Sequence, residues 1–466
     1  MKRLIYLLAL VNLFACSHTK RAYYDKKAKN WQDRSTNSPS QSPVHTLYLI
    51  GNTGDVPSSG ENPVLDELQK MIAKEAKNSS LVYLGDQLYG EGMPSKKNKE
   101  RGRAEKILNK QLDILDDFPG RTYFIPGERD WKNGRKKGLK ALKRQEKYLE
   151  NYYEQKDKVK MYPGNGCADP KVVKINKDLI FIFLDTQWWL QNWTYEKDIN
   201  QGCDIASRHD LLKHIEETLS NHKNDEVVIF MHHPIRSNGN YGGYFSLGDQ
   251  LLPLKESKNI SVPLPIIGSF ASLYRKISGT RQDLSNPLYK ELMQGIEGIA
   301  KKFRMHVLFA SAHDNSLQHF EQDKLQYIVS GSGSRSHYTT KGNGVNFAVQ
   351  RKGFCKVSFY PEFEMWAEFY AMNSSGTGVE LVYKKQLRAP RAGTVEESIK
   401  YPPINSPDTT LAANANFAAG PVKKEITPTL TESLAIAAPA NKQEATSIDA
   451  DAILVVLLNI LIFINT

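Results

Sequence analysis

The sequence is poor in cysteine, and its C-terminal apolar run is short. Only four cysteines occur in 466 residues, so a small fold held together by many disulfides is excluded. The run at residues 453–464 falls short of the about 20 residues that a transmembrane helix needs. Hydrophobic residues make up 40% of the chain, enough for a large core. The chain should therefore fold without covalent staples.

Aromatic residues do not alternate with basic ones in the manner of nucleic-acid-binding segments, so we expect no nucleic-acid partner. The formal net charge is +11, which would suit phosphate-bearing ligands or anionic membranes. Much of the excess lies in two Lys-rich stretches, residues 96–103 and 132–147. Because glutamates interleave with these lysines, we interpret both stretches as solvated helix faces.

The N-terminus has the pattern of a secretory signal. Lys2 and Arg3 precede an apolar run at residues 4–13, and Cys16 follows a small residue at the expected cleavage point. This order resembles a bacterial lipobox, in which the cysteine is lipidated after cleavage; an ordinary signal peptide with a chance cysteine is the alternative. We predict a signal peptide at 1–15, a flexible tether at 16–44 and a lipid-anchored protein of the bacterial cell envelope, periplasmic or surface-exposed.

Apart from the lipidated Cys16, three cysteines are left in the exported chain, and export permits one disulfide. Cys167 and Cys203 lie in loop-like sequence that flanks the same strand region, whereas Cys355 lies in a strand-like segment. We therefore pair Cys167 with Cys203 and expect Cys355 to be a buried thiol.

Apolar β-branched or aromatic runs alternate with amphipathic segments from residue 45 onward, a pattern typical of a layered α/β domain. The runs expected to form buried strands are residues 46–50, 81–84, 122–125, 179–184, 227–230 and 306–309. Closely spaced strands follow after residue 323 and predict a second, mostly antiparallel sheet. The domain should end at 388, followed by a disordered linker at 389–450 and an apolar tail of uncertain role at 451–466.

Polar residues of metal-ligand type follow five of these runs directly. They are Asn52, Asp86 with Tyr89, Glu128, His232 with His233, and His313 with Asn315. A single such loop is weak evidence, since a Gly-Asp pair can be a turn and a His pair can be core packing. Parallel strands bring such loops to one edge of a sheet, where carboxylate and imidazole groups could converge on a divalent metal.

The ordered set resembles the five-block signature of calcineurin-like metallophosphoesterases, and Tyr89 in Gly85-Asp86-Gln87-Leu88-Tyr89 is similar to the purple acid phosphatase branch. The resemblance covers about residues 46–318. It implies a four-layered αββα sandwich of two mixed sheets, a binuclear metal site and hydrolysis of phosphate esters. Asp86, Tyr89, His232 and His313 match the family's ligands directly.

Other positions depart from the family pattern. Asn52 stands where the resemblance implies an Asp, and Asn315 where it implies a second His, so the first metal site is weakened. Glu128 replaces an Asn ligand of the second site, and Arg129 replaces the His that acts as the acid in the family. We therefore expect one divalent ion rather than two, Zn, Fe or Mn, held by Asp86, Glu128, His232 and His313.

The expected catalytic residues are Arg129, Asp130 and His233. Arg129 cannot donate a proton at working pH, but its guanidinium fork suits phosphate oxygens. Asp130 is expected to orient Arg129, and His233 is either catalytic or structural. The segment 241–244, next to His232, is either a lid or an ordinary loop.

Three functions remain open. The first is an attenuated metal-dependent phosphoesterase acting on a phosphate ester. The second is an inactive module of the same fold that binds a phosphorylated ligand or partner. The third is a structural envelope protein without metal, in which Asp86 and Glu128 would be protonated or paired with Arg129.

Overall fold

The computed structural model describes residues 21–391 except 35–38, 40, 58 and 254–261. The predicted signal peptide, Cys16, the apolar tail and all but the start of the linker lie outside the described residues. Within the described residues, no helix combines the length and the hydrophobicity that a membrane span requires.

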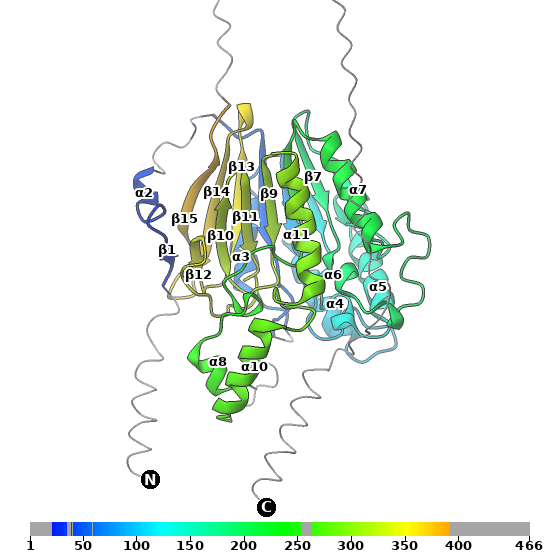
Figure 1. Ribbon diagram of the computed structural model, residues 1–466. Coiled ribbons are helices and arrows are strands. Elements are labelled where there is room, and N and C mark those ends of the chain that lie inside the picture. The colour runs from blue at the N-terminus through cyan, green and yellow to red at the C-terminus, as the bar shows by residue number, and fades with distance from the viewer. Residues whose placement is uncertain (1–20, 35–38, 40, 58, 254–261, 392–466) are drawn as a thin grey trace, which may run out of the picture.

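Two mixed sheets form the centre of the domain (Figure 1). The seven-stranded sheet has the order β15 (Val379–Arg388), β14 (Met365–Met372), β13 (Gly353–Phe359), β2 (His45–Ile50), β3 (Ser79–Tyr83), β4 (Arg121–Phe124), β5 (Val159–Met161). The eight-stranded sheet has the order β1 (Tyr23–Tyr24), β12 (Val345–Val349), β10 (Leu317–Gln322), β11 (Leu325–Ser330), β9 (Val307–Ser311), β8 (Glu226–Phe230), β7 (Leu179–Phe183), β6 (Lys171–Lys174). Each of the six predicted buried runs coincides with a strand, β2, β3, β4, β7, β8 or β9.

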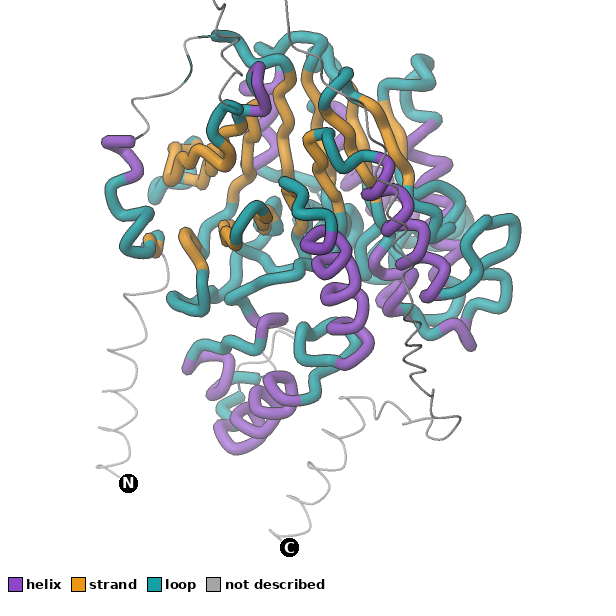
Figure 2. The backbone as a smooth tube through the Cα atoms, turned by 45° about the horizontal axis from the view of Figure 1, so that its top comes forward, coloured by secondary structure: helices purple, strands orange, loops and turns teal. Residues whose placement is uncertain are grey.

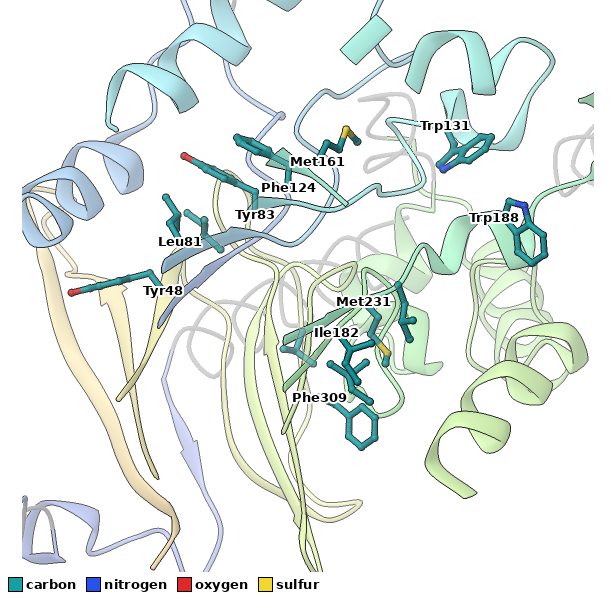
Figure 3. Close-up of a cluster of buried hydrophobic side chains, with 14 of the residues drawn as sticks. Tyr48, Leu81, Tyr83, Phe124, Trp131, Met161, Ile182, Trp188, Met231 and Phe309 are labelled. Atoms are coloured by element: carbon teal, nitrogen blue, oxygen red, sulfur yellow. The ribbon is translucent and has the colours of Figure 1, made fainter. Parts of the chain in front are cut away.

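The two sheets stack because their strands bury both faces. In β2, Leu47 and Leu49 point into the core between the sheets, whereas Tyr48 and Ile50 join the core beneath the outer helices. This alternation follows from the two-residue period of a strand. Figure 3 shows part of the core beneath the outer helices. Tyr83 and Phe124 come from the seven-stranded sheet, and Ile182 and Phe309 come from the eight-stranded sheet.

Helices cover the outer face of each sheet, which gives the four-layered αββα sandwich that the sequence predicted. The helices that pack on the seven-stranded sheet are α3 (Pro63–Ile72), α4 (Arg101–Asp113) and α5 (Gly138–Glu150). Those on the eight-stranded sheet are α6 (Thr186–Leu190), α7 (Arg208–Asn221) and α11 (Pro287–Lys302), of which α7 and α11 lie side by side in Figure 1. The pair α8 (Leu247–Leu251) and α10 (Pro265–Ile277) projects from the sandwich (Figure 2).

The late strands do not form a sheet of their own, contrary to the prediction. Strands β10, β11 and β12 extend the eight-stranded sheet, and β13, β14 and β15 extend the seven-stranded one. Strand β11 also runs parallel to β9. The reason is that β13 pairs with β2 in the seven-stranded sheet, whereas β11 pairs with β9 in the eight-stranded sheet. The last strands of the chain are therefore added to both sheets.

The segment predicted as a flexible tether at 16–44 is folded where the structure describes it. Strand β1 pairs antiparallel with β12, and the short helix α2 (Trp31–Arg34) contacts β15. Tyr24 donates a hydrogen bond to the carbonyl oxygen of Val382 at 2.7 Å. These contacts extend the domain to residue 21, because the aromatic side chains of this polar segment find an apolar surface.

The predicted disulfide is confirmed. Cys167 and Cys203 are bonded, and Cys355 is a buried free cysteine in β13. The bond joins the loop before β6 to the loop before α7.

Candidate metal and phosphate site

The five predicted loops meet at one edge of the sandwich. Strands β2, β3 and β4 run parallel in one sheet, and β8 and β9 run parallel in the other. The predicted site residues lie in the loops at the carboxyl ends of these strands. Tyr89 and Arg129 are partly exposed. The other site residues are at least nine-tenths buried: Asn52, Asp86, Glu128, Asp130, His232, His233, His313 and Asn315. The order of the parallel strands thus positions the candidate site.

Backbone geometry at the strand ends is unusual. Asn52, Asp86 and His313 adopt φ of 54°, 58° and 59°, a left-handed conformation that costs about 1–3 kcal/mol for a residue with a side chain. Two glycines let the loops approach closely, because a Cβ on Gly85 would lie 2.4 Å from His232 Nδ1 and one on Gly127 would lie 2.3 Å from Asp86 Oδ1. Strain of this kind is typical of functional sites.

His232 presents one free nitrogen to Asp86. Its Nδ1 lies 2.7 Å from the carbonyl oxygen of Leu84 and therefore carries the proton. Its Nε2 is buried, lacks a hydrogen-bond partner among the described residues and lies 3.5 Å from Asp86 Oδ1. Burial lowers the pKa of His232, which keeps the ring neutral. A neutral imidazole whose other nitrogen donates to a carbonyl has the arrangement of a metal ligand.

His313 is held in the same way from the other side. Its Nε2 lies 2.9 Å from the carbonyl oxygen of Gln282, and its ring stacks on Tyr241 with 3.7 Å between ring centroids. Its Nδ1 is buried without a hydrogen-bond partner in the described part of the chain. Burial, and then the neighbouring histidines His233 and His232, lower the pKa of His313 well below its usual range.

Hydrogen bonds connect the residues of the predicted first metal site. Asn52 Nδ2 donates to Asn315 Oδ1 and to the carbonyl oxygen of His313, both at 3.0 Å. Tyr89 OH lies 3.4 Å from the same Asn315 oxygen, and Asn315 Nδ2 lies 3.2 Å from His337 Nδ1. Neutral amides thus bond to each other where the family pattern has an Asp and a His, although Asn52 Oδ1 is buried without a partner among the described residues.

Arg129 lies among the carboxylates. Its Nε is 2.9 Å from Glu128 Oε1 and 4.0 Å from Asp86 Oδ2, and its guanidinium lies over the Tyr89 ring, 5.2 Å from the centroid. The negative charge of Glu128 raises the pKa of Arg129 further, so the cation persists at any working pH. Burial and then the charge of Glu128 raise the pKa of Asp86 to about 8.

Asp130 has a role different from the predicted one. Its carboxylate accepts hydrogen bonds from the backbone N–H groups of Asp86, Gly127 and Leu88 at 2.8, 2.9 and 3.3 Å, and from Gln145 Nε2 at 2.9 Å. It therefore fixes the loops after β3 and β4 to each other. The guanidinium of Arg129 is paired with Glu128 instead.

Both ring nitrogens of His233 are hydrogen-bonded. Nδ1 lies 2.7 Å from Thr186 Oγ1, and Nε2 lies 2.6 Å from Gln282 Oε1. Burial and the neighbouring His232 lower the pKa of His233 well below its usual range. Of the two roles considered for His233, these contacts favour the structural one.

The donor set fits a divalent metal ion. His232, His233 and His313 each offer a nitrogen within 4.8 Å of the others, and two of these rings have a buried nitrogen without a hydrogen-bond partner among the described residues. Asp86 supplies a carboxylate 3.5 Å from one of them. Buried polar atoms without partners are costly, so the free nitrogens of His232 and His313, which lie in one cluster, are available to a shared ligand. Of the four predicted ligands, the two carboxylates are both engaged by Arg129. Its Nε lies 2.9 Å from Glu128 Oε1, and its backbone N–H donates to Asp86 Oδ1 at 2.8 Å.

Gln282 is a residue of the site that sequence reasoning missed. It contacts His233 through its side chain and His313 through its carbonyl oxygen. It lies between α10 and α11, outside every recognised block, and carries no motif of its own. Tyr241, assigned by sequence only to a possible lid, stacks directly on a predicted ligand.

The domain combines two mixed sheets and outer helices with histidines and carboxylates at adjoining strand ends. Residues 46–264 match the family model described as calcineurin-like phosphoesterase. The matched residues include the loops of Asn52, Asp86, Glu128 and His232, and the match supports a hydrolase that acts on phosphoric esters.

Solved structures with similar folds share little sequence with this chain. The anchor protein GAP50 of the Plasmodium inner membrane complex has 16% identity and a TM-score of 0.46, covering 75% of this chain and 90% of its own. The purple acid phosphatase PPD1 from yellow lupin (Lupinus luteus) has 12% identity and a TM-score of 0.40, covering 75% and 55%. Vacuolar protein sorting 29 from Cryptosporidium parvum has 10% identity and a TM-score of 0.31, covering 74% and 100%. No curated protein sequence matches the chain.

Proposed function

We propose that the domain is a metal-dependent phosphoesterase that uses one divalent ion, Zn, Fe or Mn, at the second half-site. The observation that supports this most directly is the pair of buried imidazole nitrogens on His232 and His313, which have no hydrogen-bond partners among the described residues. Asp86 lies beside the first of them. Such an ion would supply an activated water and polarise a phosphoryl oxygen.

The protein's own residues would bind and orient the ester. Arg129 carries a permanent charge beside the site and can hold phosphate oxygens through its planar fork. To do so it must share its guanidinium between Glu128 and the substrate. The Asn52–Asn315–Tyr89 hydrogen bonds keep the first half-site ordered without a second ion.

Metal analysis of the purified protein tests this proposal. We expect about one ion per chain, and the variants His232→Ala and His313→Ala should lose it together with hydrolysis of aryl phosphates. The exposed His209→Ala is the matched control and should keep both. The double variant Asn52→Asp/Asn315→His should bind about two ions, because it restores a charge and an imidazole. A native protein that takes up no metal under any loading condition would refute the proposal.

A non-catalytic binding module is the second candidate. It is favoured by one observation, the ion pair in which Arg129 neutralises Glu128 and lies near Asp86. In that arrangement the cation compensates the buried carboxylates, and the module would bind a phosphorylated ligand without hydrolysing it. A protein with one bound metal that does not hydrolyse even aryl phosphates would support this candidate.

The proposed location is the bacterial cell envelope, with the chain anchored by lipid on Cys16. The support is the sequence alone: a charged start, an apolar run and a cysteine after a small residue. The disulfide between Cys167 and Cys203 is compatible with an oxidising compartment.

A further inference from the structure

A cavity of about 630 Å³ adjoins the candidate site. Its walls are the loop after β3, from Leu88 to Gly92, and the facing sides of α4 and α5. The volume is in the range of small-molecule sites. Tyr89 connects the two regions, since it lines the cavity and its hydroxyl lies 3.4 Å from Asn315 Oδ1 in the candidate site.

Basic side chains dominate the charged groups of this cavity. They are Arg103 on α4, Lys132 in the loop after Arg129, and Lys137, Lys140 and Arg144 at the start of α5 and along it. The last three are spaced by three and four residues, which places them on one face of the helix. Some basic residues of the stretches that we interpreted as solvated helix faces thus line a concave surface.

Acidic side chains neutralise only part of this charge. Glu91 and Glu100 line the cavity, and Glu91 is already paired with Lys132 at 3.1 Å and with Arg135 at 3.8 Å. Arg103, Lys137 and Lys140 lie on the wall without such a pair to any described residue. The cavity therefore carries a net positive charge with basic groups available to a ligand.

Arg144 is held in place although no carboxylate of the described residues balances it. Its Nε and Nη2 both donate to the carbonyl oxygen of Met93, at 2.9 and 2.7 Å. A guanidinium fixed by a backbone carbonyl leaves its remaining N–H groups for an anion.

We propose that this cavity binds a second anionic group, phosphate or carboxylate, on the alcohol part of the substrate. The inference rests on the proposed phosphoesterase function and specifies its substrate class: phosphate esters whose leaving group carries a further negative charge. The reacting phosphoryl group lies at the His232 and His313 side of Tyr89, and the second anion at the Arg103 and Lys140 side. The cavity wall also includes the apolar residues Leu88 and Ile107, against which a short carbon skeleton could pack.

The binding test uses calorimetric titration of the full chain with inorganic pyrophosphate, both in native protein and in His232→Ala. We expect Arg103→Ala/Lys140→Ala to weaken pyrophosphate binding about tenfold in both backgrounds, because two charged hydrogen-bond donors are lost. The control variant Lys143→Ala/Lys147→Ala also removes two positive charges, but from the part of α5 outside the cavity. It should bind pyrophosphate with the affinity of the native protein. If the two double variants bind pyrophosphate with equal affinity, the proposed anion site is wrong.

The kinetic test compares phenyl phosphate with 1,4-phenylene bisphosphate. Native protein should prefer the bisphosphate in kcat/KM about tenfold, and Arg103→Ala/Lys140→Ala should lose this preference because its kcat/KM for the bisphosphate falls. The control pair Lys143→Ala/Lys147→Ala should keep both the preference and the native turnover of phenyl phosphate. A preference that survives in the double variant would overturn the substrate class. If neither ester is hydrolysed, the proposed function fails, whereas the pyrophosphate titration still decides whether the cavity is an anion site.

Discussion

Arg129 differs from the other residues of the candidate site because its positive charge is permanent and already interacts with neighbouring side chains. It pairs with Glu128 and lies over Tyr89, so it can compensate carboxylates or bind phosphate, but it cannot protonate a leaving group. Hydrolysis should therefore depend strongly on how readily the leaving group departs unprotonated.

We expect the native protein to cleave aryl phosphates far faster than alkyl phosphates. The variant Arg129→His should lower the ratio of the aryl to the alkyl rate about a hundredfold, since a positioned acid contributes on that scale. The variant Arg129→Gln should lower both rates and leave their ratio unchanged. Steady-state kinetics on phenyl and ethyl phosphate measures the ratio. Equal rates in the native protein would indicate that another group donates the proton.

His45 gives a second residue-scale prediction, far from the candidate ligands. It is buried at the start of β2, where its Nε2 lies 3.1 Å from Ser80 Oγ, and burial lowers its pKa to about 4. The unfolded chain takes up this proton first as the pH falls. The stability associated with neutral His45 is thus fully present above pH 6.5 and is lost as the pH falls to about 4.

The loss from His45 alone should reach about 3 kcal/mol of the free energy of unfolding. His45→Gln keeps a polar atom near Ser80 without the charge, so its stability should fall less between pH 6.5 and 4. Denaturant titrations at several pH values measure the slopes, with His209→Gln as the exposed control. Identical slopes for native protein and His45→Gln would contradict the assignment.

Sequence predicted the position of most site residues, but not their partners. Asn52, Asp86, Glu128, His232 and His313 were predictable because each directly follows a buried strand, and parallel strands end together. The partners of Asp130 and the contacts of Gln282 depend on how loops fold over one another. Neither leaves a periodic signal in the chain.

At the scale of elements, the buried strands were easier to predict than the sheets they join. Residues 46–50 and 227–230 are apolar on both faces and therefore unambiguous. The late strands alternate in the same way whichever partner they pair with, so their division between β2 and β9 was not readable. Strand β1 was missed because its two residues stand in a polar segment.

Strand β1 and helix α2 allow a direct test of the N-terminal boundary. A chain that begins at Ser42 loses the β1–β12 pairing and the contact of Trp31 with Tyr383, whose ring centroids are 6.2 Å apart. We expect its free energy of unfolding to be about 3 kcal/mol lower than that of a chain beginning at Arg21. Thermal unfolding of both chains checks this, and equal midpoints would restore the flexible-tether interpretation.

For the whole molecule, the decisive question is whether lipid on Cys16 holds it to a membrane. Cys16→Ala should move the protein from the membrane fraction to the soluble fraction without changing its circular dichroism, while Ser17→Ala should stay with the membranes. Fractionation of cells expressing each variant gives the answer. Unchanged partitioning of Cys16→Ala would refute the anchor.

If the protein is anchored by lipid on Cys16, the pairing of β1 with β12 also sets the length of the linker between the anchor and the folded domain. If the chain folded only from residue 45, the roughly 29 residues before it could extend about 100 Å, whereas the roughly seven from Cys16 to Ala22 reach about 25 Å. The domain would then be confined to a thin layer above the lipid headgroups.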